Sequence, residues 1–435
     1  MGRQTARRVL VIAALAVTVA FAWAGSASAL VYGIQGDAYG WGGGYLERFA
    51  DLGVTHAREE FDHEDRPTDY DAFFEEAAHA GIVLLPVIGS GTGVPAAGTP
   101  DGTAYTTFVR DFVHRFGPHG AFWRANPSLP QLWPTHFDIW NEPYADPIAS
   151  AGTYAGLFVA TVRAARTAAG NPAARFLLEA DISSIPASSS FPGCVGGPAS
   201  GQDWIGAMYA AQPSLGDYVD GFSVHPYGND PADAYDELFP NCAQNRWLFQ
   251  RIEEIRERLD AQGEATKPFW ITEIGHPSDG CSNCSLTEQD DFMAGYIAGA
   301  QALDYVDGFF PHHFRETCTD TGNKECWFGL AYHRSTTSTV FPKPAYTTYA
   351  SAIASDPPDV TAPARPTGTT ASVTLRWSAN SPADDVLDYV VYRDGAPIAH
   401  VTGTSYVDTG FDPAAGHDYA ITARDHAGNE SPVAP

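Results

Sequence analysis

The strings FDIWNEP at residues 137–143 and FWITEIG at residues 269–275 each join an apolar run of strand length to a carboxylate. The acids are Glu142 in the first string and Glu273 in the second. An unpaired charge at the end of a buried strand costs several kcal/mol, so local structure gives no reason for either ending. Two such endings indicate two acids that meet in one pocket.

Both strings belong to a regular alternation of apolar runs with amphipathic stretches over residues 30–354. The apolar runs predict strands at 30–35, 54–61, 82–89, 135–142, 174–182, 218–225, 268–274 and 306–312. The amphipathic stretches predict helices at 45–52, 70–80, 103–116, 153–169, 203–211, 245–262, 287–303 and 344–354. Eight such units favour an α/β fold, the (β/α)8 TIM barrel, whose active sites lie at the C-terminal ends of the strands. A doubly wound sheet would need a phosphate-loop fingerprint after the first strand, and GWGGG at 40–44 does not match it.

The pattern changes at the end of the barrel region. Residues 355–362 open a proline-rich linker, which is typically stiff and extended. Residues 363–435 show short runs with a period of two, separated by turns rich in Gly, Asp and Pro. They predict a separate domain, a small all-β sandwich of the immunoglobulin-like type.

Residues 1–29 have the pattern of a signal peptide. A basic start precedes an apolar run, and the small residues of ASA at 27–29 form a cleavage site. The pair Arg7-Arg8 leaves a twin-arginine signal open. No later segment is long and apolar enough to span a bilayer, so we expect a secreted, extracellular protein without a membrane anchor.

Composition narrows the possible partners of this chain. The formal net charge is −27, which repels nucleic acid and anionic lipid, so neither is an expected partner. The six cysteines are even in number, and an exported chain favours disulfides. If each cysteine bonds to the next one along the sequence, the disulfides are Cys194–Cys242, Cys281–Cys284 and Cys318–Cys326. The alternative is a zinc site built from the last four of these cysteines.

Two parts of the chain resemble known families. The barrel region is similar to retaining glycoside hydrolases of clan A, which include family 5 cellulases and family 39 xylosidases. The resemblance rests on Arg58, WNEP at 140–143, HPY at 225–227, TE at 272–273, FGL at 328–330 and KPAY at 343–346. The C-terminal region resembles a fibronectin type III domain through Trp377, YVVYRDG at 389–395, Tyr406, Asp408 and DHAGN at 425–429.

The clan resemblance implies a role for each polar residue of the site. Glu142 would be the acid/base and Glu273 the nucleophile. Arg58 would favour the charged form of Glu273, and Tyr227 would donate a hydrogen bond to it. Asn141 would hold the 2-hydroxyl of the sugar.

Further residues have two interpretations each. His225 fits either a sugar contact or a structural barrel histidine, and Glu179 and Asp181 fit either the pocket or loop ion pairs. His312 and His313 stand where many clan members carry Trp, which changes the expected floor of the subsite for the cleaved sugar. Four aromatic residues are expected to stack on sugars or to pack: Tyr39, Trp41, Trp140 and Trp327.

The clan resemblance implies retaining, double-displacement cleavage of a glycosidic bond. With the predicted secretion and the appended β-domain, we expect the substrate to be a β-linked extracellular polysaccharide. Long loops that carry separate aromatic residues favour cleavage inside the glycan chain. We expect the enzyme to be a monomer that needs no cofactor and no metal. The alternatives are an exo-acting glycosidase, a transglycosylase and a non-catalytic carbohydrate-binding protein. A non-catalytic protein is expected to have lost a carboxylate, and this chain retains both.

Overall fold

The computed structural model describes residues in both predicted regions. In the barrel region these are 30–89, 93–144, 150–168, 173–180, 204–227, 248–281 and 284–356. In the C-terminal region they are 367–368, 373–377, 380, 386–409, 417, 419–426 and 429–431. The predicted signal peptide at 1–29 and most of the predicted linker lie outside the described residues.

Eight parallel strands form a closed barrel, as the sequence predicts. The barrel closes because β1 pairs with β8, with Val31 opposite Gly308. The strands are β1 Val31–Gln35, β2 His56–Phe61, β3 Val83–Ile88, β4 His136–Ile139, β5 Arg175–Glu179, β6 Gly221–Val224, β7 Phe269–Ile274 and β8 Val306–Pro311. Each strand lies within its predicted apolar run.

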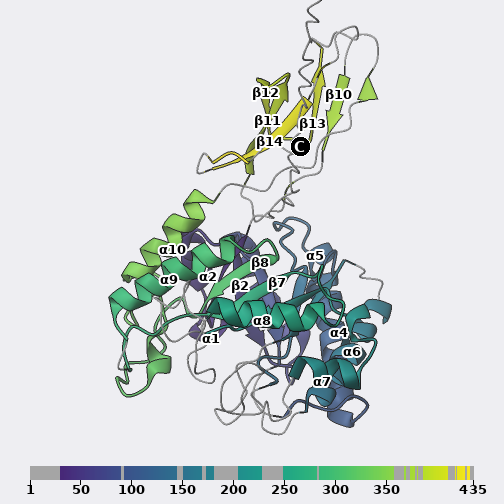
Figure 1. Cartoon of the computed structure of the whole chain (residues 1–435), viewed down its shortest axis with the longest axis vertical. Coiled ribbons are helices and arrows are strands. Elements are labelled where there is room, and N and C mark those ends of the chain that lie inside the picture. The colour runs from purple at the N-terminus through teal and green to yellow at the C-terminus, as the bar shows by residue number, and fades with distance from the viewer. Residues whose placement is uncertain are drawn as a thin grey trace, which may run out of the picture.

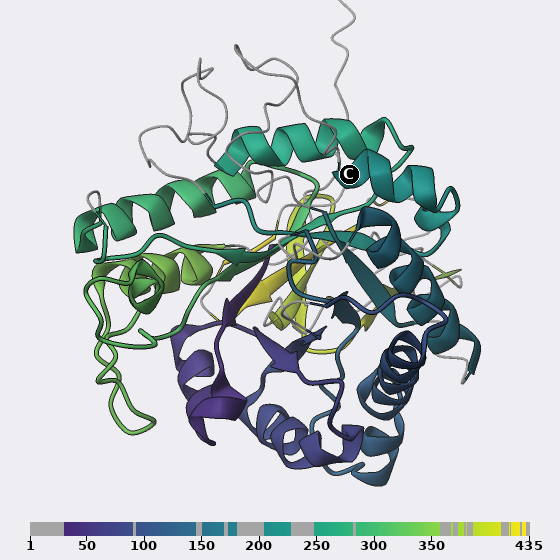
Figure 2. The same ribbon diagram turned by 90° about the horizontal axis from the view of Figure 1, so that it is seen from below.

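Helices surround this barrel, as the end-on view in Figure 2 shows. The eight predicted helices are α2 Tyr45–Leu52, α3 Asp71–Ala80, α4 Pro100–Phe116, α6 Ala151–Ala168, α7 Trp204–Ala211, α8 Leu248–Asp260, α9 Leu286–Gln301 and α10 Pro344–Ser355. Side-chain caps set some of the boundaries: Thr99 caps α4 and Ser285 caps α9 by accepting from backbone N–H groups. The short helices α1 Ala38–Trp41 and α5 Ala121–Ala125 were not predicted, because one turn carries no periodic signal.

The interior of the barrel is filled in layers. Leu85, Leu177 and Trp270 come from alternate strands and pack together with Phe310, which is possible only across the barrel interior. Gly33 makes room for this layer, since a Cβ there would lie 2.1 Å from the ring of Phe310. Two residues after Leu177, Trp270 and Phe310 the chain carries the polar residues Glu179, Thr272 and His312, so the apolar layer lies below a polar layer at the C-terminal face.

The C-terminal region contains two three-stranded antiparallel sheets, as expected for a sandwich. One sheet has the order β13 Ser405–Asp408, β10 Val373–Arg376, β9 Thr367–Gly368; the other has β12 Ala396–Val401, β11 Val386–Arg393, β14 Tyr419–Asp425. Their own core contains Leu375, Trp377, Tyr389, Val391, Ile421 and Ala423. The exact domain boundaries and the fibronectin type III assignment stay predictions.

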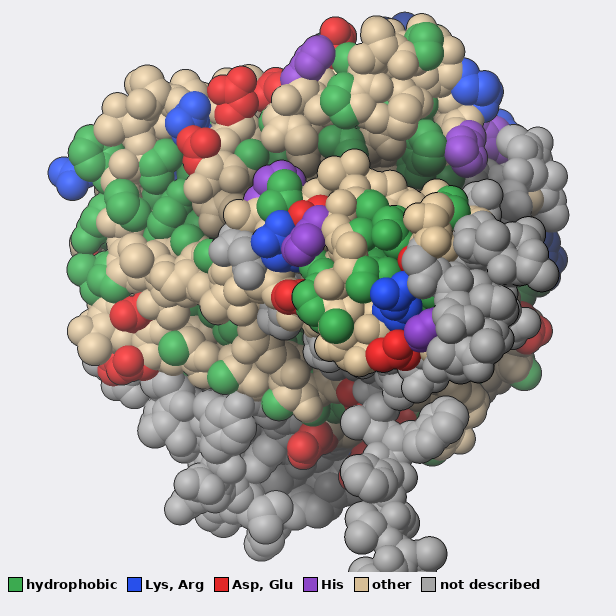
Figure 3. All heavy atoms as spheres, turned by 90° about the horizontal axis from the view of Figure 1, so that it is seen from above, with side chains coloured by type: hydrophobic (Ala, Val, Ile, Leu, Met, Phe, Trp, Pro, Cys, Tyr) green, Lys and Arg blue, Asp and Glu red, His purple; other side chains and the backbone are tan. Residues whose placement is uncertain are grey.

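These sheets lie beyond the end of the barrel at which α10 terminates (Figure 1). Helices of such a barrel run opposite to the strands, so this end carries the N-terminal ends of the strands. Asn429 contacts the barrel here, because its Nδ2 donates to the carbonyl oxygen of Ala354 at 2.8 Å. Figure 3 looks down on this end of the molecule, where acidic and basic side chains are interspersed rather than gathered by sign.

Two of the three predicted disulfides are confirmed. Cys281 bonds to Cys284, and Cys318 bonds to Cys326. The four cysteines of the alternative zinc site are therefore used in disulfides. The third predicted pair, Cys194–Cys242, lies outside the described residues. Both observed disulfides lie in loops that follow β7 and β8, on the face where strand C-termini emerge.

Candidate active site

The acids at the ends of the two predicted strands, Glu142 and Glu273, meet at the C-terminal face of the barrel. Glu142 follows β4, and Glu273 is the fifth residue of β7. Their side chains are 35% and 11% exposed. One carboxylate oxygen of each and a ring nitrogen of His225 all lie within 4.8 Å of one another. The carboxyl groups of retaining glycosidases are similarly close, at about 5–5.5 Å.

The backbone that presents Glu142 is held in an uncommon conformation. Trp140 and Glu142 have φ values of 67° and 47°, in the left-handed backbone region that residues other than Gly rarely adopt. The N–H groups of Trp140 and Asn141 donate to the carbonyls of Ile88 and Gly89, which hold the turn against β3. A Cβ on Gly89 would lie 2.7 Å from the ring of Trp140. Such strain, maintained by tertiary packing, concentrates at functional sites.

Glu273 is surrounded by groups that favour its charged form. Arg58 Nη1 donates to Oε2 at 3.3 Å, and the Tyr227 hydroxyl donates to Oε1 at 2.6 Å. Burial alone would raise the pKa of Glu273. The charges of His225 and Arg58 and the Tyr227 hydrogen bond outweigh burial, so the pKa lies below its ordinary value. Glu273 is therefore a carboxylate at neutral pH, as a nucleophile must be.

Glu142 has different neighbours. His225 Nδ1 lies 2.9 Å from Glu142 Oε1, and the Tyr144 hydroxyl donates to the same oxygen at 3.2 Å. Burial raises the pKa of Glu142, but the hydrogen bond and the charge of His225 lower it more, so the net shift is downward. A general acid needs the opposite shift, so the charge state of His225 decides what Glu142 can do.

Asn141 lies beside the acids with one end of its amide engaged. Its Oδ1 accepts a hydrogen bond from Arg58 Nη2 at 2.7 Å. Arg58 is fully buried and also donates to Asp138 Oδ2 at 3.2 Å. These contacts fix the amide so that its NH2 group faces away from the guanidinium, which suits a donor to a sugar hydroxyl.

Two aromatic residues predicted to bind sugar have structural contacts in this fold. The Arg315 guanidinium lies 4.5 Å from the ring centroid of Trp41, and Tyr45 packs edge-on against the same ring. The Trp327 indole N–H donates to the Asp320 carbonyl at 3.0 Å within the loop after β8. Their roles in sugar binding stay predictions.

His312 and His313 follow β8 beside Glu273, where the resemblance leads one to expect Trp. His312 Nδ1 lies 3.4 Å from Glu273 Oε1. Burial and the nearby charges of Arg58 and His225 lower the pKa of His312 to about 3, so it is neutral. At the position expected to form the floor of a sugar subsite, the chain therefore carries a neutral imidazole that can hydrogen-bond, where a Trp would offer an apolar face.

Two polar residues of the site, Gln35 and Asp138, were not predicted. Gln35 ends β1, and with its amide oriented to satisfy its neighbours, its nitrogen donates to Glu273 Oε2 at 3.2 Å. Asp138 stands inside the apolar run of β4 and is fully buried. Both carried a signal, a polar residue on the inward face of a strand. Glu179 proves to be fully buried on β5, whereas Asp181 lies outside the described residues.

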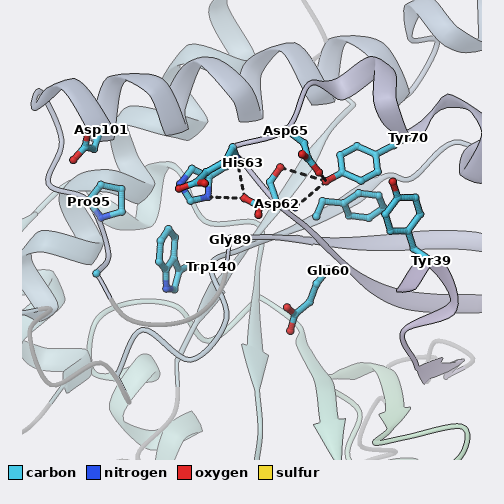
Figure 4. A pocket seen from close by; sticks show the side chains of 13 residues that line it. Tyr39, Glu60, Asp62, His63, Asp65, Tyr70, Gly89, Pro95, Asp101 and Trp140 are labelled. Atoms are coloured by element: carbon cyan, nitrogen blue, oxygen red, sulfur yellow. Dashed lines mark hydrogen bonds and ion pairs between the residues drawn. The ribbon is translucent and has the colours of Figure 1, made fainter. Parts of the chain in front are cut away.

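A cavity of about 580 Å³ opens beside Trp140. Figure 4 shows Trp140 and Tyr39 on opposite sides of it, with Glu60 and Asp62 between them. It lies over the ends of β2 and β3, and β2 is also the strand that carries Arg58. Trp140, which lines the cavity, lies two residues before Glu142.

A single cation could contact all three of the side chains that cluster here, those of Glu142, His225 and Glu273. Arg58 already places a fixed positive charge 3.3 Å from Glu273. The arrangement therefore favours a pair of catalytic carboxyl groups over a metal site.

The fold is the one seen in solved glycoside hydrolases, while no protein-family model matches the chain. One similar structure is a family 39 glycoside hydrolase from Bacteroides cellulosilyticus WH2, with a TM-score of 0.52 and 17% identity over 88% of this chain and 79% of that one. Another is a glucosidase from Croceicoccus marinus, with a TM-score of 0.50 and 13% identity over 94% of this chain and 96% of that one. At these identities the likeness establishes the fold alone.

Curated relatives match only a short segment. Chitinase C of Streptomyces lividans is 43% identical over 75 residues, which are 17% of this chain and 12% of that protein. Exoglucanase B of Cellulomonas fimi is 39% identical over 80 residues, which are 17% of this chain and 7% of that protein. The segments have the length of the C-terminal β-region rather than the barrel.

Within the described residues, no helix has the length and apolar character needed to cross a membrane.

Proposed function

We propose that this chain is a retaining glycoside hydrolase that cleaves β-linked bonds in an extracellular polysaccharide. The proposal rests on one observation above all. Two carboxyl groups lie close together at the C-terminal face of a (β/α)8 barrel, and among the described residues only Glu273 has a buried arginine beside it. Retaining glycosidases need this asymmetry, because one carboxyl must be ionised while the other carries a proton. The two disulfides support an extracellular location.

In the first step Glu273 attacks the anomeric carbon as Glu142 protonates the leaving oxygen. A glycosyl ester of Glu273 forms, the bond to the leaving group breaks, and Glu142 becomes a carboxylate. Tyr227 and Arg58 hold Glu273 in place for attack. Asn141 donates to the 2-hydroxyl, a contact that strengthens in an oxocarbenium-like transition state.

In the second step water replaces Glu273 at the anomeric carbon. Glu142 now acts as base, takes a proton from the water and returns to its acid form. The partial exposure of Glu142 supports this assignment, since the acid/base must reach both the leaving group and water. Glu273 is released as a carboxylate, and Arg58 again balances its charge.

The first products of a soluble β-glycan test the proposal. Two displacements at one carbon preserve configuration, so proton NMR in the first minutes should show the β-anomer before mutarotation. The cavity beside Trp140 supports a cleft with several subsites, so chromatography of the same samples should show a mixture of oligosaccharides. Net inversion would disprove the double displacement. Release of a single sugar from the outset would instead indicate an exo-acting enzyme.

A chain that ends at Ser355 should hydrolyse a soluble glycan at close to the full-length rate. The C-terminal sheets contact the barrel at the end of α10, far from the face that carries Glu142 and Glu273. We expect kcat/KM to change by less than about threefold, because the sheets contribute no residue to the described site. A loss of tenfold or more on soluble substrate, in a truncated chain that still melts cooperatively, would contradict this arrangement.

A further inference from the structure

A buried acid lies beneath the proposed catalytic pair and has no part in the two displacements. Glu179 is on the inward face of β5, and its side chain is 0% exposed. Its Oε1 lies 3.3 Å from His225 Nε2 and 3.1 Å from Ser223 Oγ. On the opposite side of the imidazole, His225 Nδ1 lies 2.9 Å from Glu142 Oε1. Contacts thus run without a gap from Glu179 through His225 to the proposed acid/base.

The hydrogen atoms around Ser223 are too few for the contacts seen there. Ser223 Oγ lies 2.9 Å from Asp138 Oδ2, 3.1 Å from Glu179 Oε1 and 2.5 Å from Thr272 Oγ1. A serine hydroxyl supplies one hydrogen. Burial raises the pKa of Asp138 too, and its Oδ1 also lacks a hydrogen-bond partner among the described residues. Asp138 Oδ2 nevertheless accepts from Arg58 Nε and Nη2, whereas Arg58 Nη2 lies 3.7 Å from Glu179 Oε1, so Asp138 is the better stabilised carboxylate of the two. Glu179 therefore completes its contacts best by carrying a proton of its own.

The second carboxyl oxygen of Glu179 also indicates that Glu179 carries a proton. Among the described residues, Glu179 Oε2 is buried and has no hydrogen-bond partner. A buried carboxylate oxygen without a donor is costly, and protonation removes most of that cost. Burial accordingly raises the pKa of Glu179 well above its ordinary value, although the charges of His225 and Arg58 act in the opposite direction.

The charges on Glu179 and His225 depend on each other. Burial lowers the pKa of His225, but the charges of Glu179 and Glu273 and the hydrogen bond to Glu142 raise it to about 10. That value requires a charged Glu179. If Glu179 keeps its proton, the largest support for a charged imidazole is lost. A single proton can therefore lie on Glu179 or on His225, and the second arrangement places a positive charge beside Glu142.

We propose that Glu179 and His225 share one proton, and that its position switches Glu142 between acid and base; this inference rests on the proposed function. Before the first step the proton is on Glu179 Oε1, His225 is neutral, and Glu142 can carry its own proton. Glu273 then stays ionised through Arg58 and Tyr227, without the charge of His225. When Glu142 gives that proton to the leaving group, the shared proton moves from Glu179 to His225 Nε2. The imidazolium then stabilises the Glu142 carboxylate, and the proton returns when Glu142 takes one from water.

Other charged and titratable groups surround this pair. They are Arg58 and Glu60 on β2, Tyr105 on α4, Asp138 on β4, Tyr154 on α6, Glu273 on β7, and His312 and His313 after β8. Arg58 keeps its charge throughout. The charge that changes most during the reaction is that of Glu273, which becomes neutral as an ester just when Glu142 becomes negative.

The variant Glu179→Gln in the full-length protein tests the switch, because glutamine keeps the shape and stays neutral at every pH. On an aryl β-glycoside with a poor leaving group, the alkaline limb of kcat/KM should move up by about half a pH unit or more. The second step loses the support of the imidazolium, so kcat and KM should fall together by about tenfold. Added azide, which needs no base, should restore kcat.

Tyr154→Phe is the matched control. The Tyr154 hydroxyl accepts from the Glu179 backbone N–H at 3.0 Å, so this variant disturbs the same strand without changing the proton count. Tyr154→Phe should leave the alkaline limb of the kcat/KM pH profile unchanged. An unmoved limb in Glu179→Gln would overturn the inference while leaving the proposed function intact, whereas a wild-type protein inactive on all β-glycosides would defeat the proposed function itself.

A measurement on the wild-type protein covers the case in which Glu179→Gln does not fold. The ring ¹⁵N shifts of His225, assigned by comparison with His225→Gln, report its charge. The imidazole should be neutral in the free protein at the pH of maximal activity and charged after Glu273 is trapped with a 2-fluoro β-glycoside. The same charge state in both forms would contradict a shared proton.

Discussion

Replacing Glu273 by alanine should reduce hydrolysis of a β-glycan by on the order of 10⁴-fold or more, the scale seen when a covalent nucleophile is removed. Glu273 is the one carboxylate held by both Arg58 and Tyr227, so no neighbour can take over the attack. Initial rates on a soluble glycan measure the loss. Added azide should restore part of it and give the α-glycosyl azide, because a small anion can enter from the side that Glu273 occupied.

Glu257→Ala is a control for the loss of an acid as such. Glu257 is exposed on α8, in the outer layer of the barrel, and its removal should leave the rate unchanged. A Glu273→Ala variant that keeps more than a tenth of the wild-type rate, with a normal melting transition, would show that the nucleophile has been misassigned.

Replacing Glu142 by alanine should separate substrates by their leaving groups. A natural glycan needs a proton on the departing oxygen, so its rate should fall about 10²–10⁴-fold, the usual contribution of general acid catalysis. An aryl glycoside with a good leaving group needs no proton, so formation of its glycosyl-enzyme should stay near the wild-type rate. The covalent intermediate should then accumulate, and mass spectrometry of the intact protein would detect it.

Azide distinguishes the two acids in this second variant. With Glu142 absent, azide should attack the glycosyl-enzyme and give the β-glycosyl azide, the anomer opposite to that formed by Glu273→Ala. Equal losses on good and poor leaving groups would argue that Glu142 positions the substrate and does not transfer a proton. In that event the contact with His225 would be structural.

Much of the fold followed from local pattern. The strand at 269–274 and the helix at 45–52 lie where the periodicity of the sequence predicts them, because apolar spacing reports directly which face is buried. The short helices α1 and α5 escaped prediction, since a helix of four or five residues depends on its neighbours for stability. The two observed disulfides followed from the proximity of the cysteines in the chain.

The site was predicted less completely than the fold. The strings around Glu142 and Glu273 marked the acids, and the resemblance supplied Arg58 and Tyr227. Asp138 was read as part of an apolar run, because its buried ion pair with Arg58 joins strands that are distant in sequence. Gln35 is polar on the inward face of β1, but a lone polar residue at a strand end does not indicate which side chains it contacts.

The sequence by itself determined the order of strands and helices and the two strand ends that carry the acids, since both depend on short-range spacing of side chains. Only the tertiary structure decided their charges. The low pKa of Glu273, the contact of His225 with Glu142 and the burial of Glu179 each arise where several strands converge. Electrostatic interactions depend on distance and burial in space, and closure of the barrel sets both.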